Sequence, residues 1–84
     1  MYYLYILKNK KGSYYIGTTN NIERRIQEHN NGKSKATKNR GPWNIVYTEK
    51  FRTRSQAMKR EYYIKSQKSK KFIKNLVEKI YLNN

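Results

Sequence analysis

Tyr14-Tyr15-Ile16-Gly17 is the stretch around which the rest of this 84-residue chain is organised. A second aromatic run, Tyr2-Tyr3-Leu4-Tyr5, precedes it, and Asn9-Lys10-Lys11-Gly12 separates the two runs. Aromatic residues favour strands, and a glycine-containing polar segment between two such runs favours a turn. We therefore expect a β-hairpin with strands over residues 2–7 and 13–18.

Alternation places the aromatic side chains of this hairpin on defined faces. Because successive side chains of a strand point to opposite sides, Tyr3 and Tyr5 share one face of the first strand. Tyr15 and Gly17 share one face of the second strand for the same reason. A patch of phenols beside a bare glycine can form there. The structural alternative is that the tyrosines are present only because they suit strands.

Composition limits the class of protein. The length predicts one domain over residues 1–84, with a small core that tolerates few unpaired polar groups. The absence of cysteine excludes disulfides and cysteine-based zinc sites and favours the cytoplasm. A secretory leader and an apolar run of membrane-spanning length are also missing from the sequence. We expect a soluble, cytoplasmic protein without a membrane segment.

The charge balance points to an anionic partner. The chain has 20 Lys and Arg against 5 acidic residues, which gives a formal net charge of +15. A small protein with this charge attracts polyanions from a distance, nucleic acid first and anionic membrane second. The excess does not distinguish DNA from RNA. The structural alternative is a lysine bias that only keeps the protein soluble.

A first helix is predicted from about Asn21 to Asn30. Asn20, followed three residues later by Glu23, resembles an N-cap with its reciprocal carboxylate. Gly32 is the expected stop signal.

Two polar side chains belong to the inward side of this helix. Helical spacing places the inward stripe at Ile22, Ile26 and His29. Arg25 lies on the same side, whereas Arg24 and Glu28 are expected on the solvated face. A guanidinium on the inward side of so small a domain needs an anion, either an internal glutamate or a substrate phosphate. His29 is either a packed, hydrogen-bonded histidine or a catalytic group.

A polar basic loop and a third strand follow. Residues 31–39 offer almost nothing to bury, so we expect the loop to move. Arg40-Gly41-Pro42 ends the loop. Alternating residues then predict a strand from Trp43 to about Phe51.

Two more helices complete the chain. Thr53 and Gln56 form a capping-box pattern that opens a helix from about Arg54 to Ser66. Helical spacing places Glu61 on its buried stripe. This carboxylate is either a structural ion-pair partner, for which Arg25 is the obvious mate, or part of a site.

The apolar face of the last helix consists of Phe72, Ile73, Leu76, Val77 and Ile80. The tail, Asn83-Asn84, is expected to fray.

In order and spacing, these elements resemble the GIY-YIG nuclease family, most closely its small members that are little more than the catalytic module. Tyr3-Leu4-Tyr5 corresponds to the first half-motif, and Tyr15-Ile16-Gly17 is the second half-motif intact. Arg25 and His29 match the family arginine and the position four residues after it. Glu61 matches the metal-binding glutamate. The chain departs from the family in lacking the full Gly-Ile-Tyr triplet.

The resemblance implies an α/β (α+β) fold of order β-β-α-β-α-α, with a three-stranded, mainly antiparallel sheet flanked by helices. It also implies a metal-dependent endonuclease that hydrolyses phosphodiester bonds in DNA. Because no separate sequence-reading domain is present in the sequence, we expect branched, flapped or damaged DNA as substrate. The alternative is a non-catalytic or weakly active module on the same fold that binds structured RNA or DNA.

Phosphodiester hydrolysis gives each matched residue a role. Tyr5 or Tyr15 accepts a proton, directly or through water, if nearby cations lower its pKa from about 10. Arg25 clamps the phosphate, with His29 on the same helix stripe. Glu61 holds a single Mg²⁺ or Mn²⁺, because 5 acidic residues scattered along the chain do not suit a two-metal centre.

Nucleic acid is expected to contact residues that offer space, a hydroxyl or positive charge: Gly17, Thr18, Arg24, Lys33, Lys35, Lys38, Arg40 and Lys68. Gly17 would let backbone or substrate approach closely. Thr18 stands where some relatives carry lysine. A protein partner could supply substrate specificity, and we expect a monomer or weak dimer.

Overall fold

β1 (Tyr2–Lys8) and β2 (Tyr14–Thr19) form the predicted hairpin in a computed structural model of the chain. The structure describes residues 1–82, and the side chains of residues 1–79. In the turn, the side-chain oxygen of Asn9 accepts hydrogen bonds from the backbone N–H groups of Lys11 and Ser13, at 3.1 and 2.9 Å. Gly12 has a φ of +83°, a left-handed conformation that glycine adopts without strain.

The other elements follow in the predicted order: α1 (Ile22–Asn30), β3 (Asn44–Phe51), α2 (Arg54–Ser66) and α3 (Lys70–Leu82). The strands form one antiparallel sheet in the order β2-β1-β3, with β1 at its centre. The predicted α+β fold is therefore confirmed. Asn83 and Asn84, which were expected to fray, lie outside the described residues. No helix within residues 1–82 is long and apolar enough to cross a membrane.

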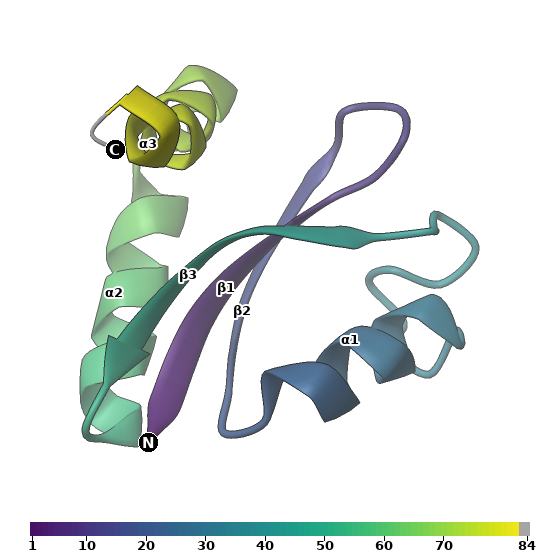
Figure 1. Ribbon diagram of the computed structural model, residues 1–84, viewed down its shortest axis with the longest axis horizontal. Helices are drawn as coiled ribbons and strands as arrows, with labels where there is room; N and C mark the ends of the chain where they lie inside the picture. Colours follow the sequence, from purple (N-terminus) through teal and green to yellow (C-terminus); the bar gives the residue numbers. More distant parts are fainter. Residues whose placement is uncertain (83–84) are drawn as a thin grey trace.

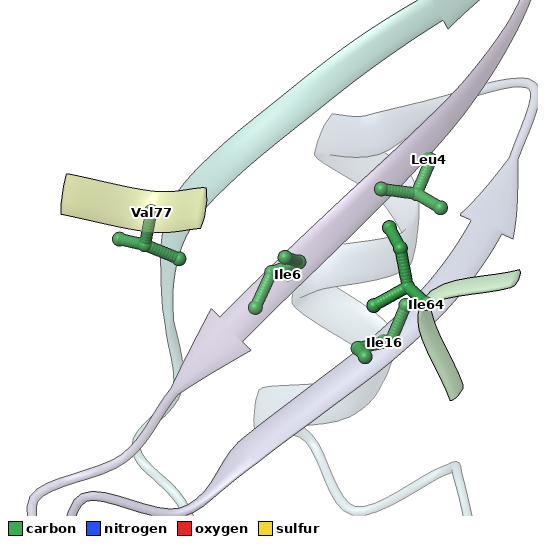
Figure 2. Packing of buried hydrophobic residues seen from close by; sticks show 5 residues of the cluster. All are labelled: Leu4, Ile6, Ile16, Ile64 and Val77. Carbon is green, nitrogen blue, oxygen red and sulfur yellow. The ribbon is translucent and has the colours of Figure 1, made fainter. Parts of the chain in front are cut away.

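Different helices cover the two faces of the sheet (Figure 1). α2 and α3 lie on one side, and their apolar residues meet those of β1 and β2. The cluster on this side consists of Leu4, Ile6, Ile16, Ile64 and Val77, all buried (Figure 2). Because helices from the end of the chain close this core, the sheet presents only its other face to α1.

The α1 side of the sheet holds a smaller buried cluster. Tyr5, Leu7 and Trp43 pack together there, with Ile26 of α1 and Tyr15 against them. Both tyrosines of the predicted site therefore lie under α1, and Tyr5 belongs to the core itself.

The start of α1 differs by one residue from the prediction. Asn21, not Asn20, is the N-cap, and its side-chain oxygen accepts a hydrogen bond from the N–H of Arg24 at 3.0 Å. The predicted capping box with Glu23 is not formed, because Glu23 is then only the second residue of the helix. Thr19 explains the shift, since its hydroxyl accepts from the Asn21 N–H at 3.1 Å and holds Asn21 ahead of the helix.

The loop between α1 and β3 is anchored, contrary to the expectation that it has almost nothing to bury. Thr37 is only 1% exposed, and its carbonyl accepts a hydrogen bond from the indole of Trp43 at 3.2 Å. The side chain of Asn30 bonds the N–H and the carbonyl of Trp43, at 2.7 and 3.2 Å. Trp43 therefore ties the loop to the end of α1, and β3 begins one residue later than predicted, at Asn44.

α2 begins and ends where the sequence predicted. The Thr53 hydroxyl accepts from the Gln56 N–H at 3.1 Å, and the Gln56 side chain accepts from the Thr53 N–H at 3.3 Å. Ala57 and Ile64 are buried on its inward side, and Glu61 lies half-buried on the same stripe. α2 therefore carries one half-buried carboxylate on its inward side.

Candidate active site

Tyr5 and Gly17 lie opposite each other on β1 and β2. A Cβ atom on Gly17 would lie 2.6 Å from the hydroxyl oxygen of Tyr5 and 2.7 Å from its Cζ. Any side chain at position 17 would therefore displace the ring. The expectation that Gly17 leaves room for the substrate is corrected here, because the phenol of Tyr5 fills that space.

Tyr5 begins a buried chain of hydrogen bonds. Its hydroxyl oxygen lies 2.8 Å from Nε2 of His29, and Nδ1 of His29 lies 2.7 Å from the hydroxyl oxygen of Thr37. The three residues are at most 2% exposed. The chain ends at the carbonyl oxygen of Ser34, 3.5 Å from the Thr37 hydroxyl.

The acceptor at the end of this chain sets the direction of its protons. When the Thr37 hydroxyl donates to the Ser34 carbonyl, the Thr37 oxygen accepts from Nδ1–H of His29. Nε2 of His29 is then the free acceptor, and the Tyr5 hydroxyl donates to it. The neutral imidazole therefore carries a lone pair that faces the tyrosine proton.

Burial raises the pKa of Tyr5 to about 12. The neighbouring Tyr15 adds to the rise, the guanidinium of Arg25 opposes it, and the charge of Glu61 makes the smallest contribution. The condition set for a catalytic tyrosine, that nearby cations lower its pKa, is therefore not met at Tyr5, because loss of hydration outweighs Arg25. Tyr5 is a neutral phenol at physiological pH.

Burial also lowers the pKa of His29. The charge of Arg25 lowers it further, and Glu28 opposes the change. His29 is therefore neutral at physiological pH, in agreement with the direction of its hydrogen bonds. Neutral histidine is the form that can take a proton from Tyr5.

Tyr15 completes a cluster of three rings. Its ring centroid lies 4.8 Å from that of His29 and 6.3 Å from that of Tyr5. Tyr15 is half-buried, so it is the more accessible of the two phenols. Within the described residues, the Tyr5 hydroxyl is hydrogen-bonded to His29, whereas the Tyr15 hydroxyl is not.

A polar pocket of about 430 Å³ adjoins this cluster through Arg25. The start of β1, the end of β2, α1 and the start of α2 border it. Its lining residues are Tyr2, Thr18, Thr19, Asn20, Arg24, Arg25, Glu28 and Arg54. Three guanidinium groups and one carboxylate line it, so the pocket suits an anion.

Arg25 finds its anion within its own helix. Its guanidinium donates to Glu28 at 2.9 Å, and this hydrogen bond lowers the pKa of Glu28. Glu28, which was expected on a solvated face, has a side chain that is 33% exposed and borders the pocket. An Arg25–Glu61 ion pair, one of the two alternatives for Glu61, is not formed, and Glu61 pairs with Lys65 at 2.5 Å.

Glu61 does not line the pocket that contains Arg25. It belongs to α2, which covers the face of the sheet opposite to α1 (Figure 1), yet its charge still acts on the Tyr5 phenol. Within the described residues, no three His, Cys, Asp or Glu side chains gather into a multi-ligand metal centre. A single carboxylate that is 23% exposed, paired with a lysine side chain that is 51% exposed, fits one Mg²⁺ that keeps most of its water ligands.

The residues predicted to bind nucleic acid lie in different parts of the molecule. Thr18 and Arg24 line the pocket. Three exposed lysines are on the α1–β3 loop: Lys33, Lys35 and Lys38. Arg40 lies over the Trp43 ring, with 5.7 Å between its guanidinium carbon and the ring centroid. Arg40 and Lys68 line a separate hollow beside the turn between α2 and α3.

Sequence reasoning missed three residues of the site. Glu28 had a local signal, because a carboxylate three residues after Arg25 is its neighbour on the helix surface. Thr37 and Arg54 had no such signal. Only packing of the loop and of α2 against the sheet brings them to His29 and to the pocket.

Known proteins resemble the chain over most of its length. Residues 1–75 match the family model described as the GIY-YIG catalytic domain. The UPF0213 protein SSP2268 of Staphylococcus saprophyticus is 49% identical over 78 residues, which cover 92% of this chain and 95% of that protein. The UPF0213 protein CPE1444 of Clostridium perfringens is 54% identical over 66 residues, which cover 77% and 71%.

Two solution NMR structures share the fold. The UPF0213 protein BH0048 of Bacillus halodurans is 41% identical with a TM-score of 0.59, and the match covers 93% of this chain and 84% of that one. The protein EF2693 of E. faecalis is 38% identical with a TM-score of 0.66, and the match covers 96% and 86%.

Proposed function

We propose that this chain, which belongs to the GIY-YIG catalytic domain family and has UPF0213 proteins as homologues, is a metal-dependent endonuclease. Membership in the family points to a nuclease. The proposed reaction is hydrolysis of a phosphodiester bond in DNA. The proposed substrates are branched, flapped or damaged DNA structures.

The observation that supports an enzyme over a binding module is the buried chain from Tyr5 through His29 to Thr37. Burying three linked polar side chains in so small a core is costly unless every donor and acceptor is satisfied. Binding nucleic acid needs only the surface cations. A proton relay beside a cationic pocket offers two things that phosphodiester hydrolysis uses, an acceptor for a proton of water and positive charge for the phosphate.

Tyr5 is the proposed acceptor for the proton of the attacking water. Its oxygen has Arg25 beside it and His29 Nε2 at 2.8 Å. As Tyr5 takes a proton from water, it gives its own proton to Nε2, and His29 becomes the cation. The high pKa of Tyr5 makes a free tyrosinate costly, so passing the proton on in the same step lowers the barrier.

Arg25 and Arg24 are the proposed clamp for the phosphate. Both border the pocket, and Arg25 is held in place by Glu28. A guanidinium can donate two parallel hydrogen bonds to phosphate oxygens, which fixes the scissile group beside Tyr5. Arg54 on the opposite wall adds positive charge from α2.

Glu61 is the proposed ligand for a Mg²⁺ or Mn²⁺ ion. When bound, such an ion supplies positive charge to the phosphoryl and leaving oxygens. Lys65, which now neutralises the carboxylate, is half-exposed and can turn away.

The test is incubation of the full chain with branched, flapped, single-stranded and duplex DNA and RNA, with Mg²⁺ or Mn²⁺ and with chelator. We expect cleavage of branched or flapped DNA only with metal. Glu61→Gln keeps the shape and removes the charge, so cleavage should fall on the order of 100-fold or more while binding in chelator is kept.

Glu78→Gln is the matched control, because Glu78 is an exposed carboxylate on α3, and it should cleave like the wild type. If the wild type cleaves nothing in the panel with either metal, the endonuclease proposal is wrong and the nucleic-acid-binding module becomes the better description. If Glu61→Gln cleaves normally, the chain is a nuclease but Glu61 is not its metal ligand.

A further inference from the structure

α2 carries two large apolar side chains that the fold leaves open to solvent. Tyr62 is 76% exposed and Met58 is 48% exposed, and they lie four residues apart on one face of the helix. Both line one shallow hollow, together with Arg54, Ser55 and Lys59. Exposed aromatic rings grouped with a methionine mark a contact surface more often than isolated apolar residues do.

The charges around this hollow decide what it can bind. Arg54 and Lys59 line it, and no carboxylate is among its lining residues. A second copy of a chain with a net charge of +15 is repelled from such a surface. The partner must therefore be anionic and must also present a flat apolar face. A nucleobase on a phosphate backbone has both properties.

The hollow is continuous with the proposed active site. Arg54 lines this hollow and also the polar pocket that contains Arg25. A strand held by the pocket at its phosphates would therefore pass Arg54 and bring its next bases to Tyr62.

We propose that Tyr62 and Met58 form a stacking platform for an unpaired nucleobase of the strand that is held at the active-site pocket. This inference rests on the proposed function and narrows its substrate class. The ring of Tyr62 stacks on the face of the base, Met58 packs beside it, and Arg54 and Lys59 hold the flanking phosphates. Bases inside a duplex cannot reach the ring, so the platform favours substrates with a single-stranded segment next to the cleaved bond.

The experiment compares two labelled oligomers by fluorescence anisotropy, at fixed salt and with chelator. One is an oligothymidylate, and the other is an abasic oligomer of the same length, which keeps the phosphates and lacks the bases. We expect the wild type to prefer the oligothymidylate. Tyr62→Ala should lose on the order of tenfold in affinity for it, which is within the range for one base on an aromatic ring. Affinity for the abasic oligomer should not change.

Two variants control the interpretation. Tyr62→Phe keeps the ring and should bind like the wild type. Tyr63→Ala removes a neighbouring tyrosine that is 49% exposed but packs against Phe72, with 6.2 Å between ring centroids, and it should leave the preference for bases intact. The platform is wrong if Tyr62→Ala binds both oligomers as the wild type does, or if it loses affinity for both equally.

Because binding is measured without metal, the result is independent of cleavage. If the wild type prefers the oligothymidylate through Tyr62 but cleaves nothing, the stacking platform is supported and the nuclease proposal is wrong. If Tyr62→Ala cleaves normally and binds both oligomers as the wild type does, the nuclease proposal is supported and the platform is wrong.

Discussion

Tyr5 of β1 packs directly over Gly17 of β2, in the space that a side chain at position 17 would occupy. The ring cannot simply swing away from a new methyl group, because it is 2% exposed and its hydroxyl is bonded to His29. The motif glycine therefore has a packing role. It lets a phenol lie flat against the neighbouring strand, where it meets the histidine.

Gly17→Ala should destabilise the protein by about 1–3 kcal/mol, the range for forcing extra atoms into a packed core. A Cβ atom 2.6 Å from the Tyr5 hydroxyl oxygen must push the ring and break its bond to His29. Chemical denaturation followed by circular dichroism measures the loss.

The same substitution in a Tyr5→Leu background serves as the control. Leucine lacks the ring atoms that the new Cβ would meet, so Gly17→Ala should cost clearly less there. Equal costs in the two backgrounds would show that the contact with Tyr5 is not the cause.

His29 links stability to pH. Its pKa is lowered, by burial first and then by Arg25, with Glu28 opposing. The unfolded chain takes up a proton near pH 6.5, the ordinary value, whereas the folded chain does so only at lower pH. The stabilisation is therefore fully present above pH 6.5 and is lost as pH falls through the folded-state pKa.

The free energy of unfolding should thus decrease below pH 6.5, by at most about 1.4 kcal/mol per pH unit for one proton. Urea denaturation at several pH values between neutrality and mild acid measures the slope. His29→Gln cannot titrate and should give a flatter profile in this window. A profile as steep as that of the wild type would assign the effect to other groups.

At the scale of elements, the α1–β3 loop supports the His29 side of α1. Thr37 reaches His29 from this loop, and Trp43 holds the backbone of Thr37 from the end of the loop. The loop therefore orients a side chain on α1 from a distance of eight residues in sequence. Thr37 is a positioning residue, because it acts through His29.

Thr37→Val keeps the shape and removes the hydroxyl, which leaves Nδ1 of His29 without its partner. We expect a loss of about 1–3 kcal/mol in stability, the cost of an unsatisfied buried polar group. The acid limb of the cleavage profile should also move to lower pH, because an imidazolium without an acceptor is less stable. Thermal melts and rates measured across pH check both effects.

Thr37→Ser restores the hydroxyl and is the control for this position. It should recover the wild-type pH profile even if a missing methyl group costs some stability. If Thr37→Val leaves the pH profile of cleavage unchanged, Thr37 has only a packing role.

At the scale of the whole molecule, positive charge covers more than one surface. The pocket beside α1 has three arginines, and a separate hollow beside the α2–α3 turn has Arg40, Lys65, Lys68 and Lys70. Binding of nucleic acid should therefore be steeply dependent on salt, because each phosphate contact releases counterions.

Arg24→Gln should lower the magnitude of the log–log salt slope by about 0.9 on duplex DNA, the value for one phosphate contact. Arg24 borders the pocket and its side chain is 55% exposed. Lys74→Gln on α3, across the sheet from α1, is the matched control and should leave the slope unchanged (Figure 1). A flat salt dependence for the wild type would mean that the charge only maintains solubility.

Local patterns in the sequence were sufficient for the elements and for several site residues. The hairpin depends on aromatic runs around Asn9 and Gly12, and α2 depends on Thr53 and Gln56, so each signal lies within a few residues of the structure that it specifies. The order of elements followed from such signals. The placement of Arg25 and His29 on one helix stripe also followed from spacing.

The rest depended on contacts between segments that are distant in sequence. Gly17 meets Tyr5 through strand pairing, Thr37 reaches His29 through a loop held by Trp43, and Arg54 of α2 lines the same pocket as the residues of α1. The pKa of Tyr5 likewise depends on burial, which outweighs the nearby cation. Local sequence patterns do not predict these contacts. Burial and long-range pairing arise only when the helices pack over the sheet.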